Sequence, residues 1–205
     1  METWKIGTNT LEYDDDTHTY IVDGVIVPSV TQILGVKFGN KYAGVNRSTL
    51  ERAASRGTAI HKAIENFCKY GENDGVKEVH NFNFLKERYG FNVLENETPI
   101  IIFKDGTPIA AGRLDLVLDV IRKGKAFYTK ETAIADIKTT SVLDKEYLAY
   151  QLNLYRIGYM QSYGRNISEL YGVHLREDKR KLVRIPVNEG IAWDIIDQYE
   201  RSLYE

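Results

Sequence analysis

The sequence predicts a mixed α/β protein in which a central mixed β-sheet is flanked by helices. The chain has 205 residues, enough for one domain with its own core. Apolar residues (43%) and charged residues (27%) stand near the globular average. Stretches with strand and helix periodicity alternate along the chain, without a linker or an internal repeat. We therefore expect residues 1–205 to form one domain, with a hairpin and helical extension at about residues 1–47.

The N-terminal extension shows a strand pattern followed by a helix signal. Residues 11–27 alternate in polarity around Asp23-Gly24, a dipeptide typical of tight hairpin turns. A short helix should follow, with Ser29 as its N-cap and Gly35 as its end.

Two further helices are predicted before the central strands. The first covers residues 48–70, with Ser48 as its N-cap and Gly71 as its stop. Gly57 interrupts this helix pattern at a cost of about 1 kcal/mol relative to alanine, which indicates a requirement other than helix formation. The second helix covers residues 78–90.

The second half of the chain contains most of the predicted sheet. Strands are expected at 98–103, 109–121 and 133–138, with turns at Asp105-Gly106 and Lys123–Lys125. A helix at 144–163 should follow, with Asp144 as its N-cap and Gly164 as its stop. A hairpin of 170–176 and 181–187 and a last helix at about 189–204 complete the chain.

Composition excludes several classes of protein. The single cysteine, Cys68, rules out a disulfide framework, a cysteine-based zinc site and a four-cysteine iron–sulfur cluster. A net charge of −2 argues against a protein that coats nucleic acid through a broad positive field. No run of about 18 apolar residues occurs, and the first residues lack the layout of a signal peptide. We therefore expect no membrane association and a cytoplasmic location.

Two segments contain an acidic residue followed two positions later by lysine. Glu177 and Lys179 lie in a run of charges that is typical of a solvated turn. Asp136 and Lys138 instead end an apolar strand, where a carboxylate is unexpected unless it has a partner. Residues two apart on a strand point to the same face. Asp136 and Lys138 are therefore the candidate catalytic pair.

Asp115 is a second carboxylate in an apolar strand, Leu114–Leu118. If the strands at 109–121 and 133–138 are antiparallel neighbours, Asp115 and Asp136 face each other across the pair. Each aspartate alone would fit an ordinary edge carboxylate. Two carboxylates held together repel, and a divalent cation is the usual remedy. Together with Lys138 on the same face, they favour a metal site.

Two helices carry further polar candidates at i, i+4 spacing. His61 and Glu65 share a face of the helix at 48–70, and taken alone His61 fits a hydrogen-bonded core residue as well as a ligand. Gln151 and Tyr155 share a face of the helix at 144–163, where aromatic residues at this spacing also fit plain core packing.

The order of these clusters resembles the PD-(D/E)xK nuclease superfamily, in particular its RecB-like branch. The pattern of that branch is a helix with glycine and then histidine, a Gly-x-x-Asp strand, an Asp/Glu-x-Lys strand and a helix with Gln-x-x-x-Tyr. The matching residues here are Gly57 and His61, Gly112 and Asp115, Asp136 and Lys138, and Gln151 and Tyr155. The segment Val27–Leu34 is also similar to the opening of phage and mitochondrial single-strand exonucleases of this branch.

The resemblance implies a restriction-endonuclease-like core and metal-dependent hydrolysis of DNA. His61, Asp115, Asp136 and the carbonyl of Ile137 would hold one or two Mg²⁺ or Mn²⁺ ions, without an iron–sulfur cluster. Lys138 would orient or deprotonate the attacking water and balance charge on the phosphate. Gln151 and Tyr155 would position the scissile strand. Glu65 and Glu97 are candidates for extra carboxylates at the site. Basic side chains could line a path for DNA, and the candidates are Arg47, Arg52, Arg56, Lys37 and Lys41.

The function expected from this resemblance is a metal-dependent DNA exonuclease in phage recombination, replication or repair. Its substrate would be single-stranded or end-processed DNA, in the host cytoplasm if the chain is phage-encoded, and recombination or replication proteins would be its partners. A structure-specific endonuclease of the same fold is one alternative. A catalytically silent nucleic-acid-binding relative is another, and it predicts a missing carboxylate or lysine, whereas all are present.

Overall fold

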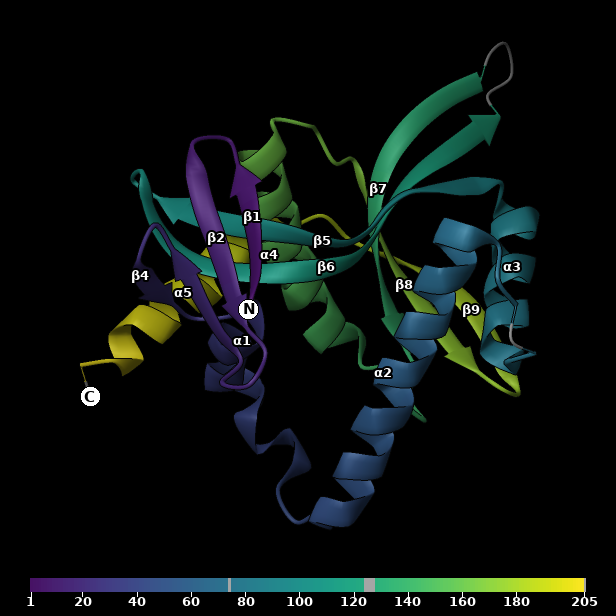
Figure 1. The fold of residues 1–205 in the computed structure, drawn as a ribbon, viewed down its shortest axis with the longest axis horizontal. Helices are drawn as coiled ribbons and strands as arrows, with labels where there is room; N and C mark the ends of the chain where they lie inside the picture. Colours follow the sequence, from purple (N-terminus) through teal and green to yellow (C-terminus); the bar gives the residue numbers. More distant parts are fainter. Residues whose placement is uncertain (74, 124–127, 205) are drawn as a thin grey trace.

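The computed structural model describes residues 1–73, 75–123 and 128–204. It has a mixed α/β fold with two sheets (Figure 1). The larger sheet has the order β5 (Phe91–Lys104), β6 (Thr107–Lys123), β7 (Tyr128–Lys138), β8 (Glu169–Arg176) and β9 (Lys179–Ile185). The smaller sheet has the order β1 (Glu2–Ile6), β2 (Asn9–Asp14), β3 (Thr19–Val22) and β4 (Val25–Val27).

Helices cover both faces of the larger sheet. The helices are α1 (Val30–Phe38), the 3₁₀ helix η1 (Gly39–Tyr42), α2 (Arg47–Tyr70), α3 (Lys77–Tyr89), α4 (Lys145–Tyr163) and α5 (Glu189–Ser202). Helices α1, α4 and α5 contribute to one apolar core, and α2 and α3 contribute to the core on the other face. On β7, Ile134 belongs to the first core and Ala135 to the second, as expected for successive side chains on a strand.

The larger sheet is mixed because α4 connects β7 to β8. These two strands pair in parallel, whereas the other neighbours in the sheet are antiparallel. A parallel pair requires a crossover connection, and α4 provides it. Its ends are the predicted ones: the Asp144 side chain accepts from the backbone of Tyr147, and Gly164 ends the helix with φ +65°.

The smaller sheet packs on the larger one through a shared apolar cluster. Leu11 and Val22 of the smaller sheet lie in one core with Ile101 and Ala111 of β5 and β6. The N–H of Ala111 also donates to the carbonyl of Pro28, 3.0 Å away. The smaller sheet therefore lies beside the first half of β6 (Figure 1).

Several predicted boundaries are wrong. Ser29 does cap α1 in a capping box with Gln32, but α1 continues through Gly35 to Phe38, because this exposed glycine keeps a helical backbone. Helix α2 begins at Arg47 with Asn46 as its N-cap, since the Asn46 side chain accepts from the N–H of Ser48.

Strand lengths also differ from prediction. The hairpin of β3 and β4 is confirmed, whereas β1 and its hairpin with β2 were not predicted. Strand β5 begins at Phe91 rather than residue 98, because polar residues in its first half obscure the apolar alternation. The turn predicted at Lys123–Lys125 falls largely outside the described residues.

None of the helices in residues 1–73, 75–123 and 128–204 is both long enough and apolar enough to cross a membrane.

Gly112 of the Gly-x-x-Asp strand is required by close packing. A Cβ atom there would lie 3.0 Å from Cε1 of Tyr155 and 3.2 Å from Cγ2 of Val30, and both side chains are buried. We expect Gly112→Ala to lower the free energy of unfolding by about 1–3 kcal/mol, because the surrounding core must shift. The matched control is Gly35→Ala, where no atom lies within 4 Å of the added Cβ.

Gly35→Ala should stabilise the protein by up to about 1 kcal/mol through helix propensity. Urea denaturation of the two variants and the parent measures both effects. An unchanged free energy of unfolding in Gly112→Ala would contradict the packing explanation.

Candidate metal centre

The site forms where β6 and β7 separate. The antiparallel ladder between them ends at the pair Leu116–Ala135. One residue beyond this pair, Asp115 accepts a hydrogen bond through Oδ2 from the backbone N–H of Ile137, 2.6 Å away. A side-chain carboxylate therefore takes the place of a ladder carbonyl, and it is fixed in position by the backbone of the next strand.

The other backbone group of Ile137 orients His61. Nε2 of His61 lies 3.1 Å from the carbonyl oxygen of Ile137. A carbonyl only accepts hydrogen bonds, so Nε2 carries the proton in this contact. In the neutral imidazole, Nδ1 then presents its lone pair toward Oδ2 of Asp115, 3.6 Å away. Metal-binding histidines commonly have this arrangement, with one nitrogen donating to a carbonyl and the other free for the cation.

Glu97 of β5 is the third member of the cluster. The pairs Asn96–Leu116 and Thr98–Leu114 place Glu97 opposite Asp115. Its backbone has φ +50°, a left-handed conformation that costs a residue with a side chain about 1–2 kcal/mol. Such strain persists where the surrounding structure enforces it, and it occurs often at functional sites.

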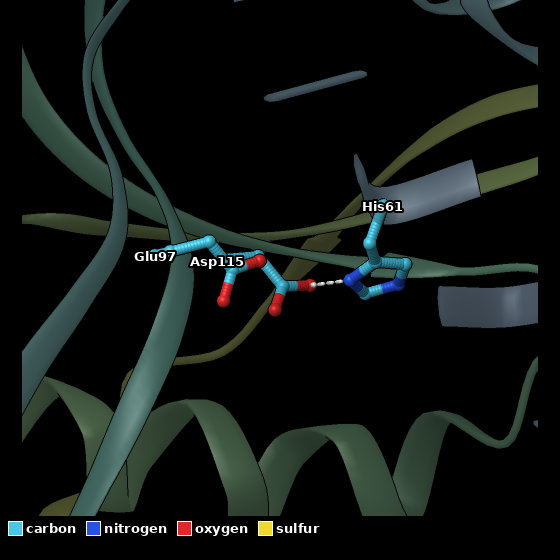
Figure 2. A group of neighbouring side chains, drawn as sticks. All are labelled: His61, Glu97 and Asp115. Atoms are coloured by element: carbon cyan, nitrogen blue, oxygen red, sulfur yellow. Dashed lines mark ion pairs between the residues drawn. The ribbon is translucent and has the colours of Figure 1, made fainter. Parts of the chain in front are cut away.

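The three side chains converge on one point (Figure 2). Ligand atoms of His61, Glu97 and Asp115 all lie within 4.8 Å of one another. Two carboxylates with one imidazole form a donor set that suits a divalent cation such as Mn²⁺, and Mg²⁺ less well because Mg²⁺ prefers oxygen ligands. The residues present therefore fit a divalent cation.

Both carboxyl groups of the cluster have raised pKa values. Burial, and next the charge of Asp136, raises the pKa of Asp115 to about 6. Burial, and next the charge of Asp115, raises the pKa of Glu97 to about 7, although Arg113 and His61 act in the opposite direction. At pH 7 Glu97 of the metal-free cluster is therefore partly protonated, and a bound cation would displace that proton.

Asp136 lies next to this cluster and pairs with Lys138. Nζ of Lys138 is 2.6 Å from Oδ2 of Asp136 and donates to Oε1 of Gln151 at 2.9 Å. Oδ2 of Asp136 is buried and accepts no hydrogen bond from the described residues. Its polar contact there is the ion pair with Lys138. Burial opposes the charge on Lys138, but the carboxylates of Asp136 and Asp115 outweigh it and raise the Lys138 pKa.

The remaining predicted site residues have different environments. Gln151 lines the cleft described below, but Tyr155 is only 6% exposed and belongs to the apolar core. Burial, with the charges of Asp136 and Asp115, raises the Tyr155 pKa well above its usual value, so its hydroxyl stays neutral. Tyr155 therefore supports the site by packing against Gly112 rather than by facing the cleft.

An open cleft of about 1340 Å³ is lined by two members of the cluster, while Asp115 lies behind them and is not part of the lining. Its lining includes His61 and Glu97, together with Lys138 and Gln151. Gly57 also lies on its wall. A Cβ at Gly57 would be 3.4 Å from Oγ1 of Thr139, an ordinary contact, so space alone does not require glycine there.

Arg113 is a site residue that the sequence analysis missed. Its Nε lies 3.1 Å from Glu97, and its guanidinium also pairs with Glu2 of β1 at 3.2 Å. Arg113 thus joins the smaller sheet to the cluster and partly balances the charge of Glu97. A charged residue between the glycine and the aspartate of the Gly-x-x-Asp strand was the available signal.

The basic residues predicted to form a DNA path do not line this cleft within the described residues. Arg47 pairs with Glu51, Arg56 with Glu78, Lys37 with Glu146 and Lys41 with Asp144, while Arg52 donates to the carbonyl of Ser48. Glu65 does line the cleft, but it bonds Lys62 and Lys69 and lies outside the three-residue cluster.

Comparisons with known proteins give a weak structural likeness. No known protein family matches the sequence, and no curated protein matches it. Among solved structures, the chain is similar to SSO0001, with 17% identity and a TM-score of 0.46 over 87% of this chain and 75% of that one. A likeness of this degree carries no conclusion about function.

The raised carboxyl pKa values predict a pH-dependent stability of the metal-free protein. The pKa of Glu97 is about 7 in the folded protein and about 4.5 in the unfolded chain. Because the folded protein binds this proton more tightly, its free energy of unfolding decreases as pH rises from about 4.5 to 7. Glu97→Gln removes this ionisation. Its advantage in free energy of unfolding over the parent should therefore grow across that pH range, as urea denaturation in EDTA measures.

The control for this prediction is Glu87→Gln, at an exposed position on α3. Its stability should follow the parent at each pH. Parallel curves for Glu97→Gln and the parent would show that Glu97 is not buried in the way described.

Proposed function

We propose that the protein is a metal-dependent nuclease that hydrolyses phosphodiester bonds of DNA, a RecB-like member of the PD-(D/E)xK superfamily. The observation that carries this proposal is a cation-sized cluster of His61, Glu97 and Asp115, two members of which, His61 and Glu97, line an open cleft together with Lys138. The ordered motifs of the sequence support it independently. A place in phage recombination, replication or repair belongs to the same proposal.

A divalent cation held by His61, Glu97 and Asp115 would lower the pKa of a water molecule and neutralise charge on the phosphate. The carboxylate of Asp136 stands beside this group and is available as a further oxygen ligand. His61 and Asp115 are held in place by the backbone carbonyl and N–H of Ile137, respectively. The Ile137 carbonyl, expected as a ligand, here accepts from His61, and its role as a ligand stays a prediction.

Lys138 is suited to bind and orient rather than to act as a base. Its raised pKa keeps the ammonium group charged at neutral pH, and Gln151 holds this group at the cleft. A charged lysine at this position would attract the phosphate and stabilise the charge that develops on its oxygens. Gln151 is then a positioning residue for Lys138.

The proposed activity requires a divalent cation. Chelation with EDTA should abolish cleavage of DNA, and Mn²⁺ should restore it at least as well as Mg²⁺, because an imidazole ligand suits Mn²⁺ better. His61→Ala should weaken Mn²⁺ binding in calorimetry. The matched control is His80→Ala on α3, outside the cluster. Unchanged Mn²⁺ affinity in His61→Ala would identify His61 as a structural residue.

Lys138 and Asp136 should be separable by substitution. Lys138→Ala should keep metal affinity but lower the single-turnover cleavage rate by about 10²–10³-fold, the usual cost of removing one group that stabilises charge developing in the transition state. Asp136→Asn should lower metal affinity as well as rate. Single-turnover cleavage and metal titration of each variant measure the two effects.

The control for this pair is Lys179→Ala. Lys179 lies in the other acidic-x-Lys segment and donates to the carbonyl of Ser141, outside the cleft. Its substitution should change neither quantity. Normal cleavage by Lys138→Ala would show that the wrong motif has been assigned.

A further inference from the structure

The cleft continues along α2 on both sides of the candidate metal cluster. The α2 residues on its wall are Ala54, Gly57, Thr58, His61, Lys62, Glu65, Cys68 and Lys69. Their spacing places them on one face of the helix. From Ala54 to Lys69 this face is about 22 Å long, and His61 lies about 10 Å from one end and about 12 Å from the other.

Contacts across the cleft define the two arms. In the first arm, Gly57 approaches Thr139 next to Lys138, and Lys138 lies 5.7 Å from the centre of the Tyr147 ring. In the second arm, Asn96 of β5 lies close enough to Cys68 to affect the pKa of its thiol, and both residues line the cleft. Strand β5 forms the wall of this second arm from Val93 to Glu97. The cluster therefore lies between two arms rather than at a closed end.

The size of the whole cleft, and the charge of the α2 residues that line its second arm, suit a nucleic acid strand. The whole cleft, about 1340 Å³, exceeds the roughly 300–1,000 Å³ of a pocket for one small molecule. The α2 face of about 22 Å corresponds to about six phosphates, at the spacing of about 3.4 Å per phosphate along the axis for one strand of a duplex. Lys62 and Lys69 both bond Glu65, and their side chains remain 65% and 45% exposed, so this trio presents net positive charge at the cleft.

We propose that the DNA strand is bound in both arms, so that the bond cut lies several nucleotides from the end of the strand and the first products are short oligonucleotides rather than mononucleotides. This inference rests on the proposed nuclease function. Lys62 and Lys69 would contact phosphates on one side of the cut, and Lys138 with Tyr147 would contact the strand on the other. A mononucleotide-releasing enzyme would need only one arm.

Two measurements test the inference. The first is the length of the earliest products from a single-stranded oligodeoxynucleotide labelled at one end and then at the other, with Mn²⁺ as the added cation. Short oligonucleotides at the earliest times are expected. Mononucleotides alone from the start would overturn the inference and leave the proposed function standing.

The second measurement does not need cleavage. Cys68 is the only cysteine in the sequence and lies in the second arm, so the same oligodeoxynucleotide with Ca²⁺ should slow its reaction with a maleimide. Unchanged thiol reactivity at saturating DNA would exclude the strand from this arm. If no cleavage occurred at all, the nuclease proposal would fail, and thiol protection would still decide the path of the strand.

A matched pair of double variants tests the contribution of the two lysines. Lys62→Gln with Lys69→Gln should reduce the slope of log affinity against log salt by about 1.4, since each phosphate contact to a single strand contributes about 0.7. Lys77→Gln with Lys179→Gln changes the charge equally outside the cleft and should leave the slope unchanged. Equal slopes for both double variants would overturn the assignment of Lys62 and Lys69.

Discussion

The candidate site depends on the two backbone polar groups of one residue, the N–H and the carbonyl of Ile137. Where β6 leaves β7, the N–H of Ile137 is bonded by Asp115 and its carbonyl by His61. These two hydrogen bonds fix side chains from β6 and α2 against the backbone of β7. They also determine which nitrogen of His61 faces Asp115. If the ladder continued past Leu116–Ala135, the N–H and carbonyl of Ile137 would be used in strand pairing, and the two side chains would have no common anchor.

The arrangement is costly to the metal-free protein. Glu97 has a left-handed backbone, and burial raises the pKa values of Glu97 and Asp115. Arg113 and Lys138 offset part of this cost through ion pairs with Glu97 and Asp136. A bound cation would offset the rest, because it stabilises both carboxylates in their charged form. Strain and buried charge are often found together at functional sites, which is consistent with the cation site proposed here.

Much of the fold follows from local signals in the sequence. Asp144 and Gly164 mark the ends of α4, and Asp23-Gly24 marks the hairpin of β3 and β4, because caps and tight turns depend on residues next to each other. Asp115, Asp136 and Lys138 were found because they are charged in apolar strands. Glu97 was named only as an additional candidate carboxylate, and its place opposite Asp115 could not be predicted, since the polar first half of β5 conceals the strand and its register with β6. Arg113 was missed because its partners, Glu2 of β1 and Glu97 of β5, lie on other strands whose register the sequence does not reveal.

The central claim is that the separation of β6 and β7 creates a cation site formed by side chains from α2, β5 and β6. Anomalous diffraction at the manganese absorption edge, from crystals grown or soaked with Mn²⁺, tests it most directly. The account predicts one strong peak in contact with Nδ1 of His61 and with carboxylate oxygens of Glu97 and Asp115. A peak that contacts none of these three residues, or no peak in the cleft at saturating Mn²⁺, would contradict it.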